Sequence, residues 1–359
     1  MVQNIVRKTL RLFIAAVFSI TVISGLFACD NYSVMDFICF NTGVYVAVKG
    51  DLSAETENSL KTAFKELENS LSVKGDGEIA AFNAQSAETP FFLSEDVCAV
   101  FIKAKELHSF TDGLFNPAVL PILRLWKLSS DTFDNKLITI NPPTEKEITD
   151  ILPLCDFNKI SLDNGAIIKK ENGICVDFGG IAKGYAADMA REILFAAGFT
   201  EGYISVGGSS IYVFSTDEDL SVVHPRKHGE HIFTVDKNLI KNSPLSTSGD
   251  YIRYYTDING KRYPHIINGN TGYPADTGII SATVIAKDNA AETLRSACAT
   301  DAISTALMLM NKESATEFIR SRLQGFYVFL ACEKDGKKEI ISNTDSIRVL
   351  DEDYCLKLI

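Results

Sequence analysis

The sequence is short of the residues that build a disulfide framework or a nucleic-acid surface. Its eight cysteines contain no Cys-x-x-Cys pair and it has only five histidines, so neither a small disulfide scaffold nor a structural zinc site is expected. Lysine and arginine number 35 against 46 acidic residues, a formal net charge of −11, without any long basic block. Sequence-independent binding of nucleic acid needs such a block, so no nucleic-acid partner is expected.

Internal repeats and low-complexity segments are also missing, which excludes a fibrous repeat and a disordered chain. Hydrophobic residues make up 46% and charged residues 23% of the 359 positions, close to ordinary soluble globular proteins. The length leaves room for one large domain or two small ones. We expect a short leader over residues 1–28 and one folded domain over residues 29–359.

The leader has the charge and hydrophobic pattern of an export signal. Arg7, Lys8 and Arg11 precede an apolar run from Leu12 to Leu26. At about 1.5 Å per residue the run reaches roughly 22 Å, short of the ~30 Å hydrocarbon core, which favours a signal peptide over a membrane span. Residues 26–29 (LFAC) resemble the lipobox of bacterial lipoproteins, and this resemblance implies that Cys29 is lipidated. An uncleaved anchor is the alternative.

Both interpretations export residues 30–359 and attach them to a membrane surface. Removing residues 1–28 takes away three positive charges, so we expect anchoring by lipid and not by attraction to anionic headgroups. The expected location is the outer face of the cytoplasmic membrane.

The remaining chain mixes strands and helices without a regular alternation. Periodicity predicts strands at residues 43–48, 174–178, 203–206, 210–214, 279–286 and 326–331, and helices after Ser53 and at about 94–110, 181–197 and 300–310. Residues 251–255 and 263–267 flank Asn259-Gly260, a strong hairpin signal. Residues 129–150 are the most linker-like stretch. This order favours the α+β class over a βαβ fold.

A glycine-rich segment, residues 177–185 (DFGGIAKGY), lies where a predicted strand ends and a helix begins. Glycines allow a ligand to approach the backbone, and free N–H groups at a helix start favour phosphate. Lys183 would add a positive charge to the same phosphate. A tight strand-to-helix turn without a ligand would also explain the pattern.

Three oxygen-bearing side chains share one face of the predicted helix near Thr300. Asp301, Ser304 and Thr305 stand at positions i, i+3 and i+4. A carboxylate with hydroxyls is a plausible partial shell for Mg²⁺, which prefers oxygen ligands and completes its octahedron with phosphate and water. A helix carboxylate packed against two hydroxyls is the structural alternative.

His265 sits on the second predicted hairpin strand, which leads into a turn-rich loop, so its imidazole can project toward a pocket. A lone histidine is more often structural. His224, His228 and His231 form a second group, whose spacing suits a loop better than one helix face. A metal site there is a minor alternative.

Taken together and in order, these pieces resemble the ApbE family of FAD:protein FMN transferases. The matching segments are residues 77–83 (GEIAAFN), 113–119 (GLFNPAV) with Leu125-Trp126, 177–185 (DFGGIAKGY), 205–208 (SVGG), 247–251 (TSGDY), 263–274 (YPHIINGNTGYP) and 301–305 (DAIST). The resemblance spans about residues 36–332. It implies an ApbE-like α+β fold of mixed and antiparallel sheets flanked by helices, with the flavin site in a cleft between lobes.

The resemblance also implies a reaction and a set of residues. Members bind FAD and Mg²⁺ and join FMN through a phosphodiester to a Ser or Thr of an acceptor protein, with release of AMP. Flavin-nucleotide contacts fall on Leu114, Phe115, Asn116, Asp177, Lys183 and Ile267, magnesium ligands on the Gly180 carbonyl, Asp301, Ser304 and Thr305, and the catalytic histidine on His265. Acceptors would be exported flavoproteins, such as subunits of Rnf or sodium-pumping NADH:quinone reductase complexes.

Some positions depart from the family pattern, mainly on the flavin side. Asn116 stands where Asp is usual, Ser205 where Asn is usual, Gly77 where Ser is usual, and Asn268-Gly269 where Asp-Pro is usual. Two other functions therefore stay open. One is a Mg²⁺-dependent FAD pyrophosphatase that yields FMN and AMP, and the other is a lipoprotein that binds FAD without chemistry.

Overall fold

A long antiparallel sheet forms the centre of the computed structural model, which describes residues 31–134 and 139–359. Its nine strands lie in the order β1 (Tyr32–Cys39), β2 (Thr42–Lys49), β6 (Gly202–Val206), β7 (Ser210–Ser215), β10 (Ser243–Gly249), β13 (Ile279–Ala286), β14 (Phe326–Lys334), β15 (Lys337–Ser342) and β17 (Cys355–Leu358). Every neighbouring pair is antiparallel except β15 and β17. The predicted α+β class is confirmed.

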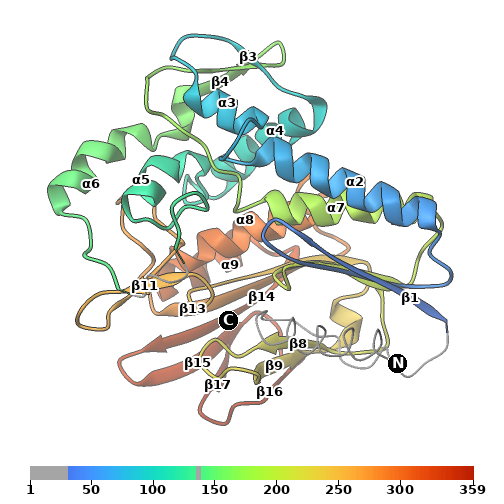
Figure 1. Ribbon diagram of the computed structural model, residues 1–359. Helices are drawn as coiled ribbons and strands as arrows, with labels where there is room; N and C mark the ends of the chain where they lie inside the picture. The colour runs from blue at the N-terminus through green and yellow to red at the C-terminus, as the bar shows by residue number, and fades with distance from the viewer. Residues whose placement is uncertain (1–30, 135–138) are drawn as a thin grey trace, which may run out of the picture.

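Helices cover one face of this sheet (Figure 1). They are α2 (Ala54–Leu71), α4 (Glu95–Phe110), α7 (Ala182–Ala196), α8 (Ala297–Met308) and α9 (Lys312–Arg322). The predicted stripe of α2 is confirmed, because Leu60, Phe64, Leu67 and Leu71 are all buried in the main hydrophobic core, and Ser53 caps the helix by accepting from the Thr56 N–H.

A small sheet covers the opposite face (Figure 1). It contains β8 (Leu220–Val223), β9 (His231–Val235) and β16 (Ile347–Val349) in the order β16-β9-β8. Strand β13 is therefore buried on both sides, with Val284 in the core beneath the helices and Ile285 in the core beneath the small sheet.

A lobe of short elements stands above one end of the helical layer. Its elements are α3 (Glu78–Ala84), α5 (Leu120–Leu125), α6 (Glu145–Ile151), β3 (Phe91–Phe92), β4 (Ile160–Asp163) and β5 (Ala166–Lys169). Single 3₁₀ turns at Pro117–Val119, Leu152–Leu154, Phe157–Lys159, Lys237–Leu239 and Glu292–Leu294 complete the connections.

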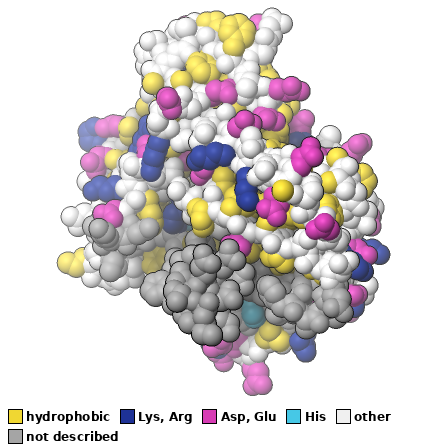
Figure 2. Space-filling model, turned by 45° about the vertical axis from the view of Figure 1, so that its right-hand side comes forward, with side chains coloured by type: hydrophobic (Ala, Val, Ile, Leu, Met, Phe, Trp, Pro, Cys, Tyr) yellow, Lys and Arg dark blue, Asp and Glu magenta, His cyan; other side chains and the backbone are white. Residues whose placement is uncertain are grey.

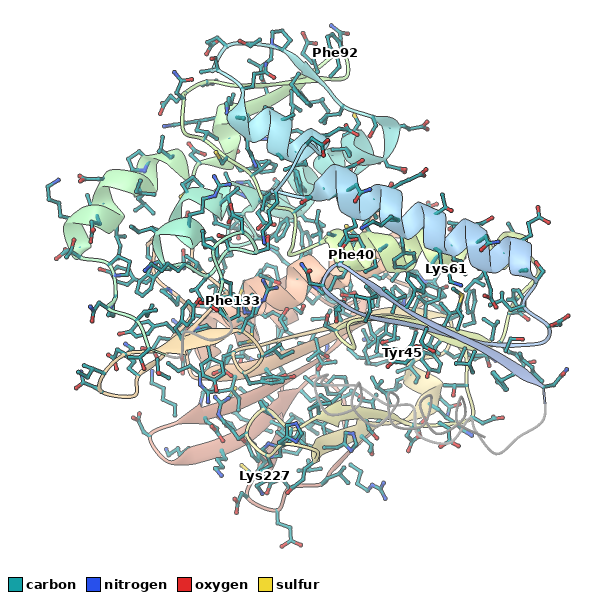
Figure 3. The ribbon with its side chains drawn as sticks, viewed as in Figure 1. Phe40, Tyr45, Lys61, Phe92, Phe133 and Lys227 are labelled. Carbon is teal, nitrogen blue, oxygen red and sulfur yellow. The ribbon has the colours of Figure 1, made fainter. Side chains whose placement is uncertain are left out.

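The hairpin β11 (Tyr254–Thr256) and β12 (Arg262–Pro264) packs against this lobe. Trp126 and Tyr255 are fully buried there, Trp126 donates its indole N–H to the Gly272 carbonyl (2.9 Å), and Phe133 stacks on Tyr255 with ring centroids 5.0 Å apart (Figure 3). The hairpin predicted around Asn259-Gly260 is present with shorter strands. Its packing brings the loop after His265 under the lobe.

Two predicted elements differ in the structure. Residues 174–178, all buried except the half-buried Asp177, belong to no sheet, because the Asn83 side chain pairs with both the N–H (2.7 Å) and the carbonyl (2.9 Å) of Val176. Helix α8 begins at Ala297 and not near Thr300, because Ser296 caps it by accepting from the Ala299 N–H. Asp301 therefore lies in the second turn of the helix.

The described part of residues 129–150, predicted as the most linker-like stretch, is more ordered than a linker. Ser129 and Ile140 are buried, and α6 begins at Glu145 with a capping box between Thr144 and Glu147. No helix in the ranges 31–134 and 139–359 is long and apolar enough to cross a membrane. The predicted leader and Cys29 lie outside the described residues.

Candidate active site

The glycine-rich segment forms a turn between the extended residues 174–178 and α7. The Gly179 N–H donates to the Asp177 carboxylate (2.7 Å), and the Asp177 N–H donates to the Pro117 carbonyl (2.8 Å). A side chain at Gly180 would meet the ring of Phe115 at 3.1 Å. Burial raises the pKa of Asp177 above its usual value, opposed by the Gly179 N–H and by the positive charges of Arg253 and Lys183.

A close contact between α7 and α8 brings this turn to Asp301. A Cβ atom at Gly184 would come within 2.3 Å of the Ala297 carbonyl oxygen, so only glycine allows the two helices to approach this far. The Gly184 N–H donates to the Asp301 carboxylate (3.1 Å), and the Lys183 ammonium lies 4.0 Å from the same carboxylate oxygen. Burial raises the pKa of Asp301, and Lys183 opposes that shift.

The hydroxyls of Ser304 and Thr305 on α8 meet the Ser248 hydroxyl of β10, and Asp301 lies one turn earlier on the same helix. The Ser248 hydroxyl is 2.8 Å from the Ser304 hydroxyl and 3.2 Å from that of Thr305, and Ser304 also donates to the Asp301 carbonyl (3.0 Å). We call Asp301, Ser304, Thr305 and Ser248 the oxygen cluster. Sequence reasoning noted Ser248 only as part of the TSGDY segment and did not assign it to the site.

This donor set fits a hard cation with few protein ligands. It offers one carboxylate and several hydroxyls, and Mg²⁺ commonly takes one or two carboxylates and completes its shell with phosphate and water. The Asp301 carboxylate is buried with Lys183 4.0 Å away, so a second positive charge there would favour its ionised form. Among residues 31–134 and 139–359, no three His, Cys, Asp or Glu side chains form a metal cluster, which separates this arrangement from a zinc centre.

His265 directly follows β12, opposite Arg253, and the Arg253 carbonyl holds it. That oxygen accepts from the His265 backbone N–H (3.0 Å) and lies 3.1 Å from the ring Nδ1. Because a carbonyl only accepts, Nδ1 carries the proton and Nε2 of the neutral ring keeps a free lone pair. Burial, with the positive charges of Arg253 and Lys183, lowers the pKa of His265 from 6.5 to about 3. The lowered pKa favours the neutral ring.

Comparison with known proteins bears on the whole of this arrangement. A family model described as the ApbE family matches residues 40–330. This chain belongs to the ApbE family. The family predicted from the sequence is thus confirmed.

Several relatives carry the name FAD:protein FMN transferase. The one from Haemophilus influenzae is 26% identical over 288 residues, covering 77% of this chain and 79% of the relative. The one from Vibrio cholerae is 24% identical over 313 residues, covering 84% and 86%, and the one from Treponema pallidum is 25% identical over 330 residues, covering 85% of each.

Solved structures of the family share the fold. The flavin transferase ApbE from Vibrio cholerae superposes with a TM-score of 0.74 at 19% identity, covering 88% of this chain and 98% of that one. The ApbE protein from Thermotoga maritima gives 0.72 at 25% identity, covering 84% and 94%. The expected ApbE-like fold is confirmed.

The flavin contacts predicted on the ApbE pattern before the 3₁₀ turn at Pro117 are mostly packed into the protein. Phe115 is buried and its carbonyl pairs with His108 Nδ1 (2.7 Å). Asn116 accepts from the Ala118 N–H (2.9 Å) and donates to the Cys155 carbonyl (2.7 Å), so its side chain is already used. Leu114 is half-buried against two core clusters. Their roles as flavin contacts stay predictions.

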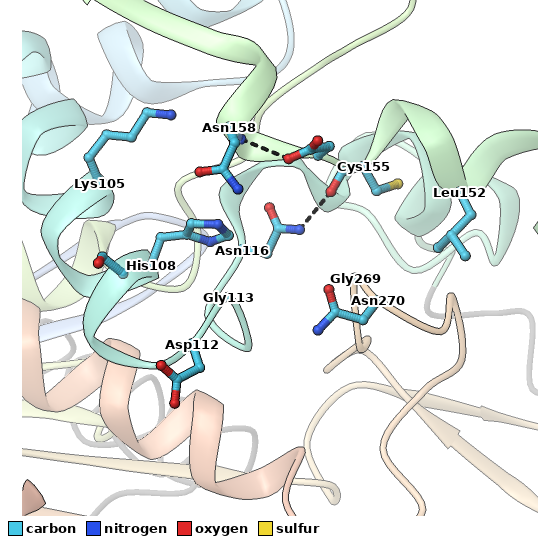
Figure 4. Close-up of a pocket in the computed structure, with 12 residues that line it drawn as sticks. Lys105, His108, Asp112, Gly113, Asn116, Leu152, Cys155, Asn158, Gly269 and Asn270 are labelled. Carbon is cyan, nitrogen blue, oxygen red and sulfur yellow. Dashed lines mark hydrogen bonds between the residues drawn. The ribbon is translucent and has the colours of Figure 1, made fainter.

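Ile267, the other predicted contact of this kind, is buried in the core of the lobe and forms an isolated bridge with Pro274. A cavity of about 530 Å³ opens beside Asn116 and Gly269 (Figure 4). Lys105 and His108 also line it, and burial lowers the pKa of both side chains, that of Lys105 to about 8. The size is in the range of ligand pockets.

The minor alternative of a metal site at His224, His228 and His231 does not fit the contacts of His224, and the described residues hold no group of three such ligands. The Nδ1 of His224 accepts the backbone N–H groups of Arg226 (3.0 Å) and Lys227 (3.1 Å), and its Nε2 donates to Asp351 (2.7 Å). Both ring nitrogens are therefore engaged. The group ties the small sheet to the C-terminal segment and leaves no lone pair for a metal.

Proposed function

We propose that this chain is a Mg²⁺-dependent FAD:protein FMN transferase that acts on a Ser or Thr hydroxyl of an exported acceptor flavoprotein and releases AMP. Membership of the ApbE family and the names of its relatives support a flavin transferase. The observation that carries the mechanism is the His265 ring, which the Arg253 carbonyl fixes, and whose pKa burial and the charges of Arg253 and Lys183 lower.

In the proposed step, the acceptor hydroxyl oxygen forms a bond to the FMN phosphorus of FAD, and the phosphorus–oxygen bond to AMP breaks with its electron pair on AMP. The hydroxyl proton moves to Nε2 of His265. The anionic pyrophosphate beside the ring would favour the protonated imidazole and so raise its basicity when substrate is bound. A Mg²⁺ ion held by the oxygen cluster and the Gly180 carbonyl would withdraw charge from the pyrophosphate and stabilise the leaving group.

The remaining roles follow from position. Lys183, with an ammonium between the Gly179 carbonyl (3.4 Å) and Asp301 (4.0 Å), would bind a phosphate oxygen next to the cation. Asp177 and the packed Leu114, Phe115, Asn116 and Ile267 would shape the flavin side of the site. Acceptors of the Rnf or sodium-pumping NADH:quinone reductase type, which are exported, would meet the site outside the cell membrane.

We further propose that the chain is exported, lipidated at Cys29 and held on the outer face of the cytoplasmic membrane. The LFAC segment supports this location. Strand β1 begins at Tyr32, so a lipid on Cys29 would leave only two residues between anchor and fold. Mass spectrometry of the mature N-terminal peptide tests it: a diacylated Cys29 is expected, and an intact residue 1–29 segment on the purified protein would contradict it.

The activity is tested with the full chain in detergent, FAD, Mg²⁺ and an acceptor domain carrying the Ser/Thr flavinylation motif. Intact-mass spectrometry should show the acceptor gaining one FMN, and the gain should need Mg²⁺ and His265. Free FMN and AMP without a modified acceptor would make the protein a FAD pyrophosphatase. FAD that stays bound and intact would leave a flavin-binding lipoprotein, and either result would overturn the proposal.

A further inference from the structure

Arg253 combines partial burial with an unpaired guanidinium. In the described ranges, 31–134 and 139–359, its side chain makes no recorded hydrogen bond or ion pair, although its carbonyl is engaged. The other half-buried arginines each contact a carboxylate: Arg124 with Asp131, Arg191 with Glu192, Arg262 with Asp250 and Arg295 with Asp288. Arginine stays protonated in proteins, so Arg253 presents a positive charge that no ion pair takes up.

The hairpin directs this charge to the side of the site that holds His265. Tyr254 pairs with Pro264, so the next opposed pair is Arg253 and His265, which the bond from the His265 N–H to the Arg253 carbonyl (3.0 Å) confirms. Directly opposed residues of an antiparallel pair place their side chains on the same face. The side chains of Arg253 and His265 therefore leave the hairpin on the same face.

The electrostatic field of Arg253 reaches both sides of the site. Its charge lowers the pKa of Asp177 on the glycine-rich turn and that of His265 on the hairpin. Burial lowers the pKa of Arg253 itself, opposed by Asp177. Lys183 acts on the same two groups from the α7 side. Two cations thus face one space from two different elements, an arrangement that suits a ligand with more than one negative charge.

We propose that the Arg253 guanidinium binds the pyrophosphate of a dinucleotide beside His265, as a second cationic contact opposite Lys183. The identification of that dinucleotide as FAD rests on the proposed function. A guanidinium can hold two phosphate oxygens at once in a fixed orientation, which an ammonium cannot. Arg253 would therefore place the phosphorus in front of the base, and its carbonyl would fix the tautomer of that base.

Substituting the side chain of Arg253 removes only the proposed phosphate contact. The backbone carbonyl of residue 253, which fixes the tautomer of His265, remains. The test compares the full chain with Arg253→Gln, Arg253→Lys and the matched control Lys261→Gln, which removes one positive charge from the exposed turn of the same hairpin. Affinities for FAD and for riboflavin, which has the flavin ring but no phosphate, are measured by flavin fluorescence without any acceptor. Thermal unfolding without ligand reports on the fold.

Arg253→Gln should weaken FAD binding by about 10- to 100-fold, the value of a charge-assisted contact, and leave riboflavin binding unchanged. Arg253→Lys should fall between the wild type and Arg253→Gln, and Lys261→Gln should match the wild type. An unchanged FAD affinity, or an equal loss for FAD and riboflavin, would overturn the proposal. Because no acceptor is present, this result is independent of whether the wild-type protein transfers FMN.

Discussion

The two halves of the candidate site are held in different ways. The helix half, with Asp301 and Ser304 on α8, is 3% and 0% exposed and is enclosed by the close contact of α7 and α8. The hairpin half, with Arg253 and His265, stands on strands of three residues each, next to Ile252 and Ile258, which are 55% and 89% exposed. Local stability follows burial and contact density, so the helix half is the more rigid part.

This difference assigns the two halves different tasks. A buried, preformed oxygen cluster suits a cation that must keep its coordination geometry. A base on a hairpin with exposed neighbours can be reached by a reaction partner as large as a protein. On the face shown in Figure 2, acidic and basic side chains are interspersed over the described part of the surface.

The largest expected effect belongs to the helix half. Asp301→Asn keeps an oxygen that can accept the Gly184 N–H but removes the charge from the oxygen cluster, so we expect the transfer rate to fall by about 10³-fold or more. The measurement is the initial rate of FMN attachment to the acceptor over a Mg²⁺ titration. Asp288→Asn, which removes an exposed carboxylate paired with Arg295, is the control. Wild-type transfer by Asp301→Asn in chelator would refute the assignment of the oxygen cluster to the cation.

The next effect separates chemistry from binding on the hairpin. His265→Gln removes the free lone pair at Nε2, so we expect a loss of about 10²- to 10⁴-fold in transfer. Affinity for FAD should stay within a few-fold of the wild type, because the lowered pKa of His265 favours a neutral imidazole that offers FAD no full charge. Fluorescence titration and single-turnover transfer measure the two quantities. A parallel loss of FAD affinity would show that the ring holds substrate instead of moving a proton.

A pair of glycine substitutions tests the difference in packing. Gly184→Ala places a Cβ against the Ala297 carbonyl and should lower the free energy of unfolding by about 1–3 kcal/mol. Gly260→Ala in the hairpin turn meets no atom within 4 Å, and its cost of about 1 kcal/mol comes only from a φ of 81°. Urea unfolding compares them. If Gly260→Ala is as destabilising as Gly184→Ala, the helix contact is not the tighter of the two.

The smallest effect is a pH dependence from the hairpin. Unfolded His265 binds its proton near pH 6.5 and folded His265 only near pH 3, so between these values the unfolded state holds more protons. The contribution of His265 to the free energy of unfolding is fully present above pH 6.5. It should fall as pH falls below that value, by up to about 1.4 kcal/mol per pH unit. Urea unfolding between pH 6.5 and 5 should give a flatter profile for His265→Gln. Identical slopes for both proteins would show that the ring is not buried in its neutral form.

Much of this architecture could be predicted because its signals are local. Neighbouring residues determine the apolar stripe on α2, the cap at Ser53 and the i, i+3, i+4 spacing on α8. Asp301, Ser304 and Thr305 share one helix face as predicted, although α8 begins three residues earlier than expected. The assignment to the family also followed from short motifs. Their order along the chain reflects a site built from several elements, which periodicity alone does not reveal.

The features that were missed depend on residues far apart in the sequence. Residues 174–178 have the composition of a strand, but their partner is the side chain of Asn83, 93 positions from Val176. The small sheet pairs β16 with β9 across more than a hundred residues. Arg253 could not be singled out from the sequence either. An arginine without an ion-pair partner is recognised only when the positions of the carboxylates in the fold are known.

The central claim is that the helix half and the hairpin half act on one phosphoryl group and pass it to a protein hydroxyl. The most direct test counts products in the same reaction: AMP by chromatography and FMN-modified acceptor by intact mass, with the full chain, FAD and Mg²⁺. We expect one AMP for each FMN attached, with both falling together in Asp301→Asn and His265→Gln. AMP that accumulates while the acceptor stays unmodified would contradict it.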